Sequence, residues 1–125
     1  MPHFDIECSS NVLAMQPAAM IMKTVYNTAE LSGLFAPNDI KVRIKTYDHY
    51  QLGDGKQSFL HIYASIMEGR TTTQKATLSS LVIQALSPLL PGISFLSMNV
   101  WEFEAATYSN RSLIDPLNKD RDRHF

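Results

Sequence analysis

The first residue in the chain that could carry chemistry is Pro2, which directly follows Met1. A small residue at position 2 favours removal of the initiator methionine, and the mature chain would then begin with a proline bearing a free secondary amine. An amine of this kind can serve as an acid or a base near neutral pH. Proline also occurs simply as the first residue of a strand, so the position alone leaves both interpretations open.

A second group of candidates consists of three cations at alternate positions, Lys41, Arg43 and Lys45. On an extended strand, alternate residues lie on one side at a repeat of about 6.6–6.8 Å. Three cations on one sheet face suit a ligand with several carboxylates, and arginine can bind a carboxylate through two parallel hydrogen bonds. A solvated outer sheet face is the alternative interpretation of the same pattern.

Arg70 is the third candidate, because it follows Gly69 directly before a predicted helix that begins at Thr71. Gln74 stands three residues after Thr71, as a capping box requires. The free N–H groups at the start of a helix attract anions, so Arg70 would add its charge to a site of that kind. The alternative is an arginine in a solvated loop.

Other kinds of site find no support in the sequence. The four histidines are dispersed and have no metal-binding spacing, and Cys8 is the single cysteine, which suits a small core residue. No phosphate-binding glycine loop or nucleophile elbow is present. We therefore expect no metal site.

The elements that must position these residues form two strand–helix–strand units. Residues alternate between apolar and polar in the predicted strands, and apolar residues recur at helical spacing between them. The predicted order is a strand at 2–8, a helix from Pro17 that ends just before Gly33, strands at 40–47 and 59–67, a helix at 71–89 and a strand at 93–104. Parallel pairing within each unit predicts an α+β fold, a four-stranded mixed sheet with two helices on one face. Trp101 or Phe103 is expected on the bare face, which partner subunits would cover.

Length, charge and composition indicate the number of domains and exclude several classes of partner. The 125 residues predict one domain spanning 1–125. Eleven Lys and Arg against twelve Asp and Glu give a net charge of −1, which lacks the excess of positive charge expected of a nucleic-acid-binding protein. No apolar run approaches the ~20 residues that cross a bilayer, so we expect no membrane partner. The single cysteine and the lack of a signal peptide favour the cytoplasm.

The N-terminal residues resemble those at the start of the sequences of a known family. Met1-Pro2-His3-Phe4 and Glu7-Cys8-Ser9 are similar to the 5-carboxymethyl-2-hydroxymuconate isomerase family of the tautomerase superfamily. The resemblance extends over most of the chain and is best up to about residue 90. The further matches are Leu34-Phe35, Arg43, Asp48, the 51–55 turn and Gly69-Arg70.

The resemblance implies a homotrimer that needs no metal or organic cofactor, with Pro2 as the catalytic base. Arg43 and Arg70 would bind the carboxylates of an unsaturated 2-hydroxy di- or tricarboxylic acid from aromatic catabolism. Burial and these two arginines would lower the pKa of the Pro2 amine towards neutrality.

Two departures from the family leave other functions open. The 41–45 stretch is more basic than the family pattern, which keeps Lys41 and Lys45 as secondary candidates for substrate binding, and the tail at 105–125 does not match. Another tautomerase reaction, such as that of an aryl pyruvate, is one alternative. A non-catalytic α+β oligomer that binds an anion through Lys41, Arg43 and Lys45 is the other.

Overall fold

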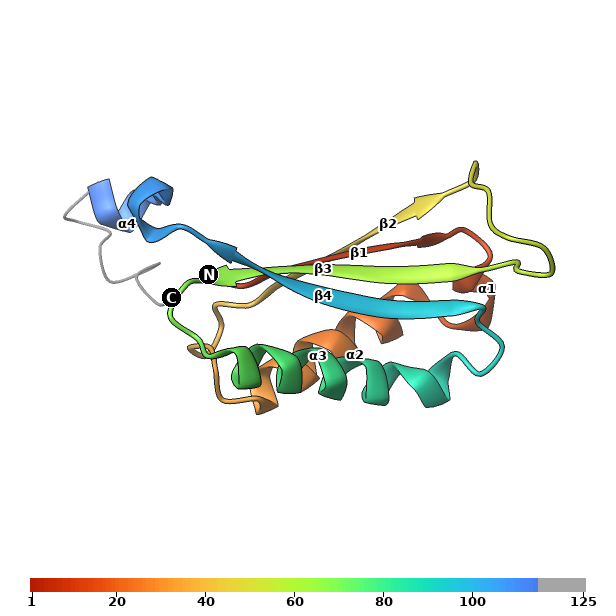
Figure 1. Ribbon diagram of the computed structural model, residues 1–125, viewed down its shortest axis with the longest axis horizontal. Coiled ribbons are helices and arrows are strands. Elements are labelled where there is room, and N and C mark those ends of the chain that lie inside the picture. Colours follow the sequence, from red (N-terminus) through yellow and green to blue (C-terminus); the bar gives the residue numbers. More distant parts are fainter. Residues whose placement is uncertain (115–125) are drawn as a thin grey trace.

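A computed structural model describes residues 1–114. It contains one four-stranded sheet with two long helices packed on one of its faces (Figure 1). In chain order the elements are β1 (His3–Ser9), α1 (Val12–Met15), α2 (Ala18–Leu31), β2 (Lys41–Tyr47), β3 (Phe59–Met67), α3 (Thr72–Leu86), the 3-10 turn η1 (Ser87–Leu89), β4 (Phe95–Phe103), the 3-10 turn η2 (Ala105–Thr107) and α4 (Arg111–Ile114). The predicted α+β fold is confirmed.

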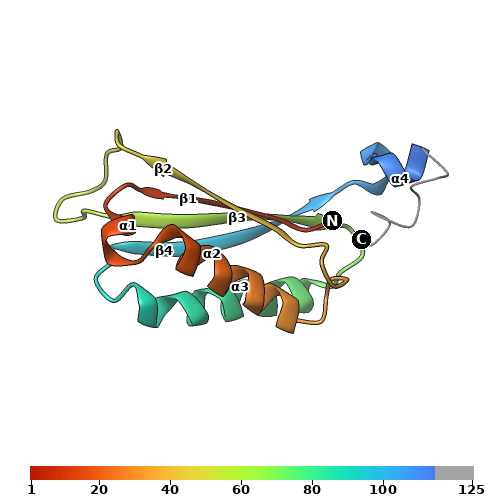
Figure 2. The same ribbon diagram turned by 180° about the vertical axis from the view of Figure 1, so that it is seen from behind.

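The sheet is mixed, with the strand order β2-β1-β3-β4. Each unit pairs its own two strands in parallel, β1 with β2 and β3 with β4. The two units meet through the antiparallel pair of β1 and β3 at the centre. The start of β1 is therefore held between β2 and β3, and this arrangement fixes the position of the N-terminus (Figure 2).

The core lies between the sheet and the two long helices. One side of each strand supplies apolar residues to it, and α2 and α3 supply the apolar residues of their inner faces. Its largest fully buried side chains are Phe4, Ile6, Ile21, Leu60, Ile62, Ile66, Leu78, Leu86, Leu90, Val12, Val25 and Val82. The alternation read from the sequence is thus confirmed for β1, where Phe4, Ile6 and Cys8 are buried.

The ends of the helices agree with the local signals in most places. Thr71 caps α3, and its side chain and that of Gln74 form the predicted capping box. Gly33 follows α2 with a φ of 73°, a left-handed conformation that glycine adopts without strain. The end of the second helix was predicted too late, because α3 stops at Leu86 and Pro88 lies in the 3-10 turn η1.

The second face of the sheet carries no helix. The register places Trp101 beside Ser65 and Ser65 beside His3, so Trp101 shares this face with His3. Trp101 is 61% exposed, and Phe103 contacts the His3 ring on the same face. Both aromatic residues therefore lie on the bare face, as predicted, and we refer to this side of the sheet as the open face.

Candidate active site

The N-terminus of the chain is buried at the start of β1. Met1 is 4% exposed and Pro2 is also buried. The Pro2 carbonyl accepts a hydrogen bond of 3.1 Å from the Lys41 N–H, which extends the parallel pairing of β1 and β2. A terminal amine is thus held inside the fold by regular strand pairing, which gives it a fixed position.

The Met1 ammonium forms an ion pair with the carboxylate of Asp39, which is 6% exposed. Burial lowers the pKa of this amine from 8.0, and the nearby charges of Lys41 and Arg70 act in the same direction. The hydrogen bond and the charge of Asp39 oppose this change. The amine therefore lies among two cations and one carboxylate, and its basicity reflects their balance.

Lys41 is the member of the basic row that lies nearest to this group. Its ammonium donates a hydrogen bond of 2.8 Å to the Asp39 carbonyl and lies 3.6 Å from the Asp39 carboxylate. Lys41 and the terminal amine therefore both contact Asp39. The sequence alone identified Lys41 only as one of three cations at alternate positions.

Arg70 reaches the same region from the loop before α3. Its guanidinium donates a hydrogen bond to the Leu34 carbonyl in the segment that precedes β2. Within the capping box, Gln74 N–H binds the Thr71 hydroxyl and Thr71 N–H binds the Gln74 side chain. Two N–H groups at this helix start therefore have partners within the chain. The influence of Arg70 on the terminal amine comes from its charge.

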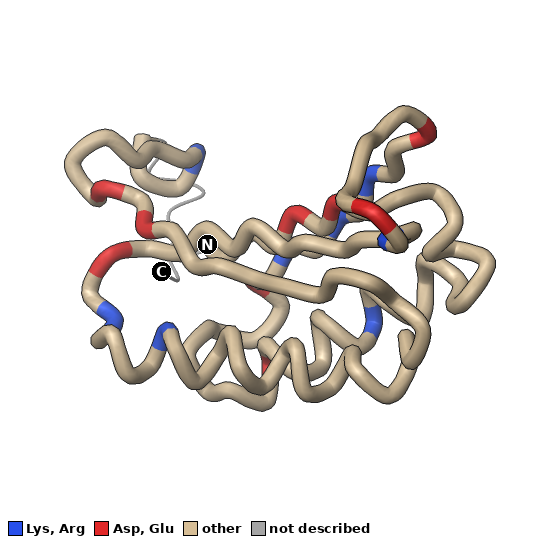
Figure 3. The backbone as a smooth tube through the Cα atoms, turned by 45° about the vertical axis from the view of Figure 1, so that its right-hand side comes forward, with Lys and Arg blue, Asp and Glu red and all other residues tan. Residues whose placement is uncertain are grey.

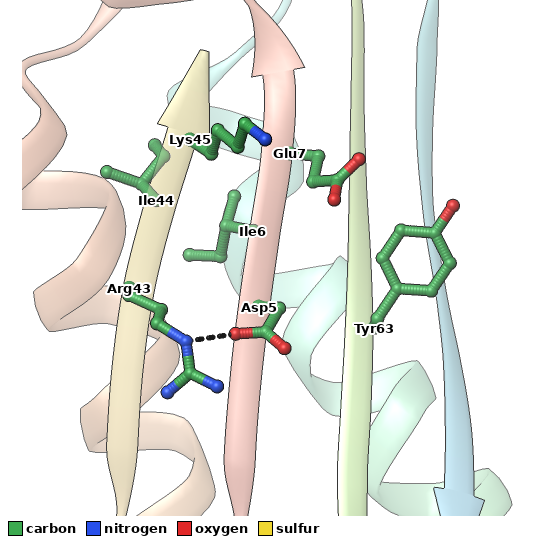
Figure 4. Close-up of a pocket in the computed structure, with 7 residues that line it drawn as sticks. All are labelled: Asp5, Ile6, Glu7, Arg43, Ile44, Lys45 and Tyr63. Carbon is green, nitrogen blue, oxygen red and sulfur yellow. Dashed lines mark ion pairs between the residues drawn. The ribbon is translucent and has the colours of Figure 1, made fainter.

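Arg43 lies farther along the open face. Its guanidinium pairs with Asp5 and approaches the His3 Nδ1 atom at 3.1 Å. Arg43 and Asp5, together with Glu7, Lys45 and Tyr63, border a hollow of about 450 Å³ over β1, β2 and β3 (Figure 4). The three cations share one sheet face, as predicted, because they pair in register with His3, Asp5 and Glu7. Their side chains nevertheless have different partners.

The long helices carry few acidic or basic residues (Figure 3), whereas β1 and β2 together carry five. Lys45 lies 5.4 Å from the centre of the Tyr47 ring, and Tyr47 donates a hydrogen bond of 2.9 Å to Glu7. Two carboxylates on β1, Asp5 and Glu7, therefore partly offset the charge of the three cations on β2.

His3 links the terminal amine to the open face. Burial lowers the pKa of His3, and the charges of Arg43 and Lys41 lower it further. Its ring meets Phe103 edge-on at 5.8 Å, and Phe103 lies 5.5 Å from Tyr108. Burial and the two nearby cations therefore favour the neutral form of the His3 imidazole.

The segment after β4 reaches the same end of the sheet. Asn110 places its side-chain nitrogen 4.0 Å from the sulfur of Met1 and 3.3 Å from the Tyr108 hydroxyl. The described part of the 105–125 tail therefore lies beside the N-terminus. The basic and acidic cluster at 119–123 lies outside the described residues.

Sequence reasoning missed Asp39 and Asn110. A local signal did exist for Asp39, because Pro37 followed by Asn38 is a turn sequence. Asn38 has a φ of 67°, and the Asp39 N–H donates to the Ala36 carbonyl at 3.2 Å. Nothing in the spacing of Asn110 indicates a contact with a residue more than 100 positions earlier.

Residues 1–114 contain neither a cluster of metal ligands nor a membrane-spanning helix. In this part of the chain, no group of three His, Cys, Asp or Glu side chains could hold a metal ion. No helix of the described chain has the length and apolar character needed to cross a membrane. Cys8 is buried, and burial raises the pKa of its thiol to about 11. We therefore take the terminal amine, with Asp39 and the cations Lys41 and Arg70, as the candidate active site.

Comparisons with known proteins give a family match and several similar folds. A family model described as 5-carboxymethyl-2-hydroxymuconate isomerase matches residues 2–116, so the expectation that the tail does not match was wrong for residues 105–116. A 5-carboxymethyl-2-hydroxymuconate Delta-isomerase of Escherichia coli is 25% identical over 88 residues, which are 69% of this chain and 70% of that protein. The crystal structure of a 5-carboxymethyl-2-hydroxymuconate isomerase from Deinococcus radiodurans R1 has a TM-score of 0.75 at 19% identity, covering 87% of both chains. A fused 4-OT wild type symmetric trimer has a TM-score of 0.69 at 18% identity, covering 86% of this chain and 90% of that one.

Proposed function

Because the chain belongs to the 5-carboxymethyl-2-hydroxymuconate isomerase family, we propose that it is a tautomerase acting on an unsaturated 2-hydroxy acid. The substrate carries two or three carboxylates, as 5-carboxymethyl-2-hydroxymuconate does. The enzyme interconverts the enol and the conjugated keto form, and the Pro2 amine moves the proton after Met1 is removed. The observation that carries the proposal is the burial of the N-terminus beside Lys41 and Arg70.

The proton transfer follows from the surroundings of the amine. A neutral Pro2 nitrogen takes the proton of the enol hydroxyl, the oxygen electrons form the carbonyl, and the double bonds shift. The protonated amine then returns a proton to a carbon of the conjugated chain. Burial and the two cations favour the neutral form of the amine, and a base with a pKa near ambient pH serves both steps.

Lys41 and Arg70 are the cations that we assign to the carboxylate nearest the reacting atoms. Both act on the terminal amine through their charges, and both reach it from fixed positions on β2 and before α3. Cations there also stabilise the negative charge that develops on the dienolate. Arg43 is a more distant carboxylate partner, because its Asp5 and His3 contacts place it farther along the open face. Lys45 lies one step beyond Arg43 in the same row.

We also propose that the chain forms a homotrimer through its open face, without a metal or organic cofactor. The face carries exposed aromatic side chains, and one of the structural neighbours is described as a symmetric trimer. Burial of Trp101, Tyr63 and Phe95 in an interface would remove apolar surface from water. Light scattering at micromolar protein should give the mass of three chains, and a monomer would contradict this assembly.

The proposed function is tested by following ketonisation of 5-carboxymethyl-2-hydroxymuconate by ultraviolet absorbance. Intact mass first establishes that Met1 is absent from the protein. General acid–base catalysis contributes typically about 10²–10⁴-fold. Pro2→Ala retains a terminal primary amine, so we expect a loss of at least about tenfold. An unchanged rate would exclude Pro2 as the acid–base group.

Substitution of the cations tests the carboxylate contacts. A hydrogen bond to a charged group contributes about 1.5–3 kcal/mol, so Lys41→Met and Arg70→Met should each lower kcat/KM about 10- to 150-fold. Lys56→Met is the matched control, because Lys56 lies in the exposed turn before β3. Arg43→Met should have a larger effect on a tricarboxylate than on the aryl pyruvate enol, a monocarboxylate. Faster turnover of the aryl pyruvate by the wild type would favour the alternative substrate class.

A further inference from the structure

We propose that Asp39 is the positioning residue of the mature N-terminus, holding the Pro2 nitrogen and the Lys41 ammonium on either side of one buried carboxylate. The inference rests on the proposed function, since it concerns the same terminal amine. In this role, Asp39 holds the Pro2 amine in position after the amine has taken a proton from the substrate and until it returns one.

The fold delivers Asp39 to this position with little freedom. Pro37 and Asn38 form a turn closed by the hydrogen bond of 3.2 Å from Asp39 N–H to the Ala36 carbonyl. Proline before a residue of positive φ is typical of a type II turn. Two residues later Lys41 pairs with the Pro2 carbonyl at 3.1 Å. The carboxylate is thus anchored on both sides by backbone hydrogen bonds.

Removal of Met1 leaves Asp39 close to the new terminus. The Met1 and Pro2 nitrogens are separated by three bonds, so they lie no more than about 3.7 Å apart. Because the Asp39 carboxylate contacts the Met1 nitrogen, it remains within the distance of about 4–6 Å at which charges shift a pKa. Loss of the Met1 ammonium would leave this buried carboxylate with the Lys41 ammonium at 3.6 Å and without its second cation, which is unfavourable. Protonated Pro2 is the cation best placed to replace the Met1 ammonium.

The other groups around the amine act in the opposite direction. Lys41 from β2 and Arg70 from the loop before α3 disfavour a positive charge there, as does burial. His3 is the first residue of β1, and the charges of Arg43 and Lys41 lower its pKa. Asn110, from the segment after β4, contacts the Met1 sulfur and the Tyr108 hydroxyl. Among residues 1–114, Asp39 is therefore the group that opposes loss of the proton.

The test measures the amine directly and does not depend on turnover. Cyanate carbamylates neutral amines, so the pH dependence of N-terminal carbamylation, followed by mass of the N-terminal peptide, reports the protonation of Pro2. An opposite charge at this range shifts a pKa by about 1–3 units. We expect the midpoint in Asp39→Asn to fall by about one pH unit or more. Asp39→Glu keeps the negative charge, so its carbamylation midpoint should lie close to that of the wild type.

Asp54→Asn is the matched control, because Asp54 is an exposed carboxylate in the turn between β2 and β3. It should leave the midpoint unchanged. Asp39→Ser is a second neutral variant if Asp39→Asn does not fold. A midpoint in a folded neutral variant equal to that of the wild type would overturn the proposal. A merely structural role would reduce the amount of folded protein without moving the midpoint.

Kinetics then separates this inference from the proposed function. The acid limb of the kcat/KM profile should move to lower pH in Asp39→Asn, in parallel with carbamylation. If Pro2→Ala keeps full activity while the amine midpoint still shifts, the proposed function fails and the role of Asp39 stands. If Pro2→Ala loses activity and the midpoint does not move, the role of Asp39 alone is refuted.

Discussion

Removal of Met1 should lower the stability of the folded chain, because the Met1 side chain occupies a buried position. Met1 is 4% exposed, and its ammonium pairs with Asp39. Full burial of a methionine side chain contributes about 1.5–3 kcal/mol. A compact unfolded ensemble reduces such values by roughly 10–40%. We therefore expect the free energy of unfolding to fall by about 1–2.5 kcal/mol, which corresponds to a Tm lower by about 3–10 °C for a chain of this size.

The assay compares two preparations of the same chain, expressed with and without an inhibitor of methionine aminopeptidase. Intact mass confirms that they differ by one methionine residue. Urea unfolding is then followed at equal protomer concentration, since assembly makes stability depend on concentration. A dicarboxylate such as fumarate should raise the midpoint of the processed form, because a ligand that binds the folded state stabilises it. It should leave the unprocessed form unchanged.

Two results would refute this reasoning. Equal unfolding midpoints for the two forms would show that Met1 does not contribute its buried area to the fold. Equal stabilisation of both forms by fumarate would show that the space left by Met1 is not part of a carboxylate site. The first result concerns packing at the N-terminus, and the second concerns the link between that packing and ligand binding.

Other predictions concern the elements that hold the site. Leu78→Ala should lower the free energy of unfolding, measured in urea, by about 2–5 kcal/mol, because Leu78 is fully buried. Leu31→Ala is the control and should change it by less than about 0.5 kcal/mol, because Leu31 is 86% exposed. Thr71→Ala should cost about 0.5–2 kcal/mol in the same assay, because it removes the cap of α3 next to Arg70. Because the pKa of His3 is lowered in the folded state, the unfolded state binds the proton more readily, and stability should fall as the pH drops below about 6.5. His3→Asn should flatten this slope between pH 7 and pH 5, while His49→Asn should not; equal slopes in all three proteins would contradict the assignment.

Local signals predicted much of the secondary structure because they depend on residues close in sequence. Alternation placed the third strand at 59–67, where β3 lies, and the Thr71–Gln74 capping box is formed as predicted. The end of α3 was missed because Pro88 lies within the apolar pattern and converts the last turn to a 3-10 turn. The short helix α1 was also missed, since the Ser9–Asn11 stretch reads as a plain turn.

The candidate site was predictable only in part. The sequence alone indicates a reactive proline at position 2, a row of three cations and an arginine before a helix, because these features lie within single segments. Tertiary structure decides which of them meet. The parallel pairing of β1 and β2 places Lys41 beside the N-terminus, and the loop before β2 brings Asp39 into contact with the terminal amine.

The same pairing gives Arg43 different neighbours, because each step of two residues along β2 places the next cation opposite a different residue of β1. Arg43 lies opposite Asp5 and pairs with it, whereas Lys41 lies opposite His3 at the start of the strand. The sequence by itself therefore determined the kinds of chemical group and the elements that carry them. Register and burial, which depend on contacts between distant segments, decided which charges act on the amine.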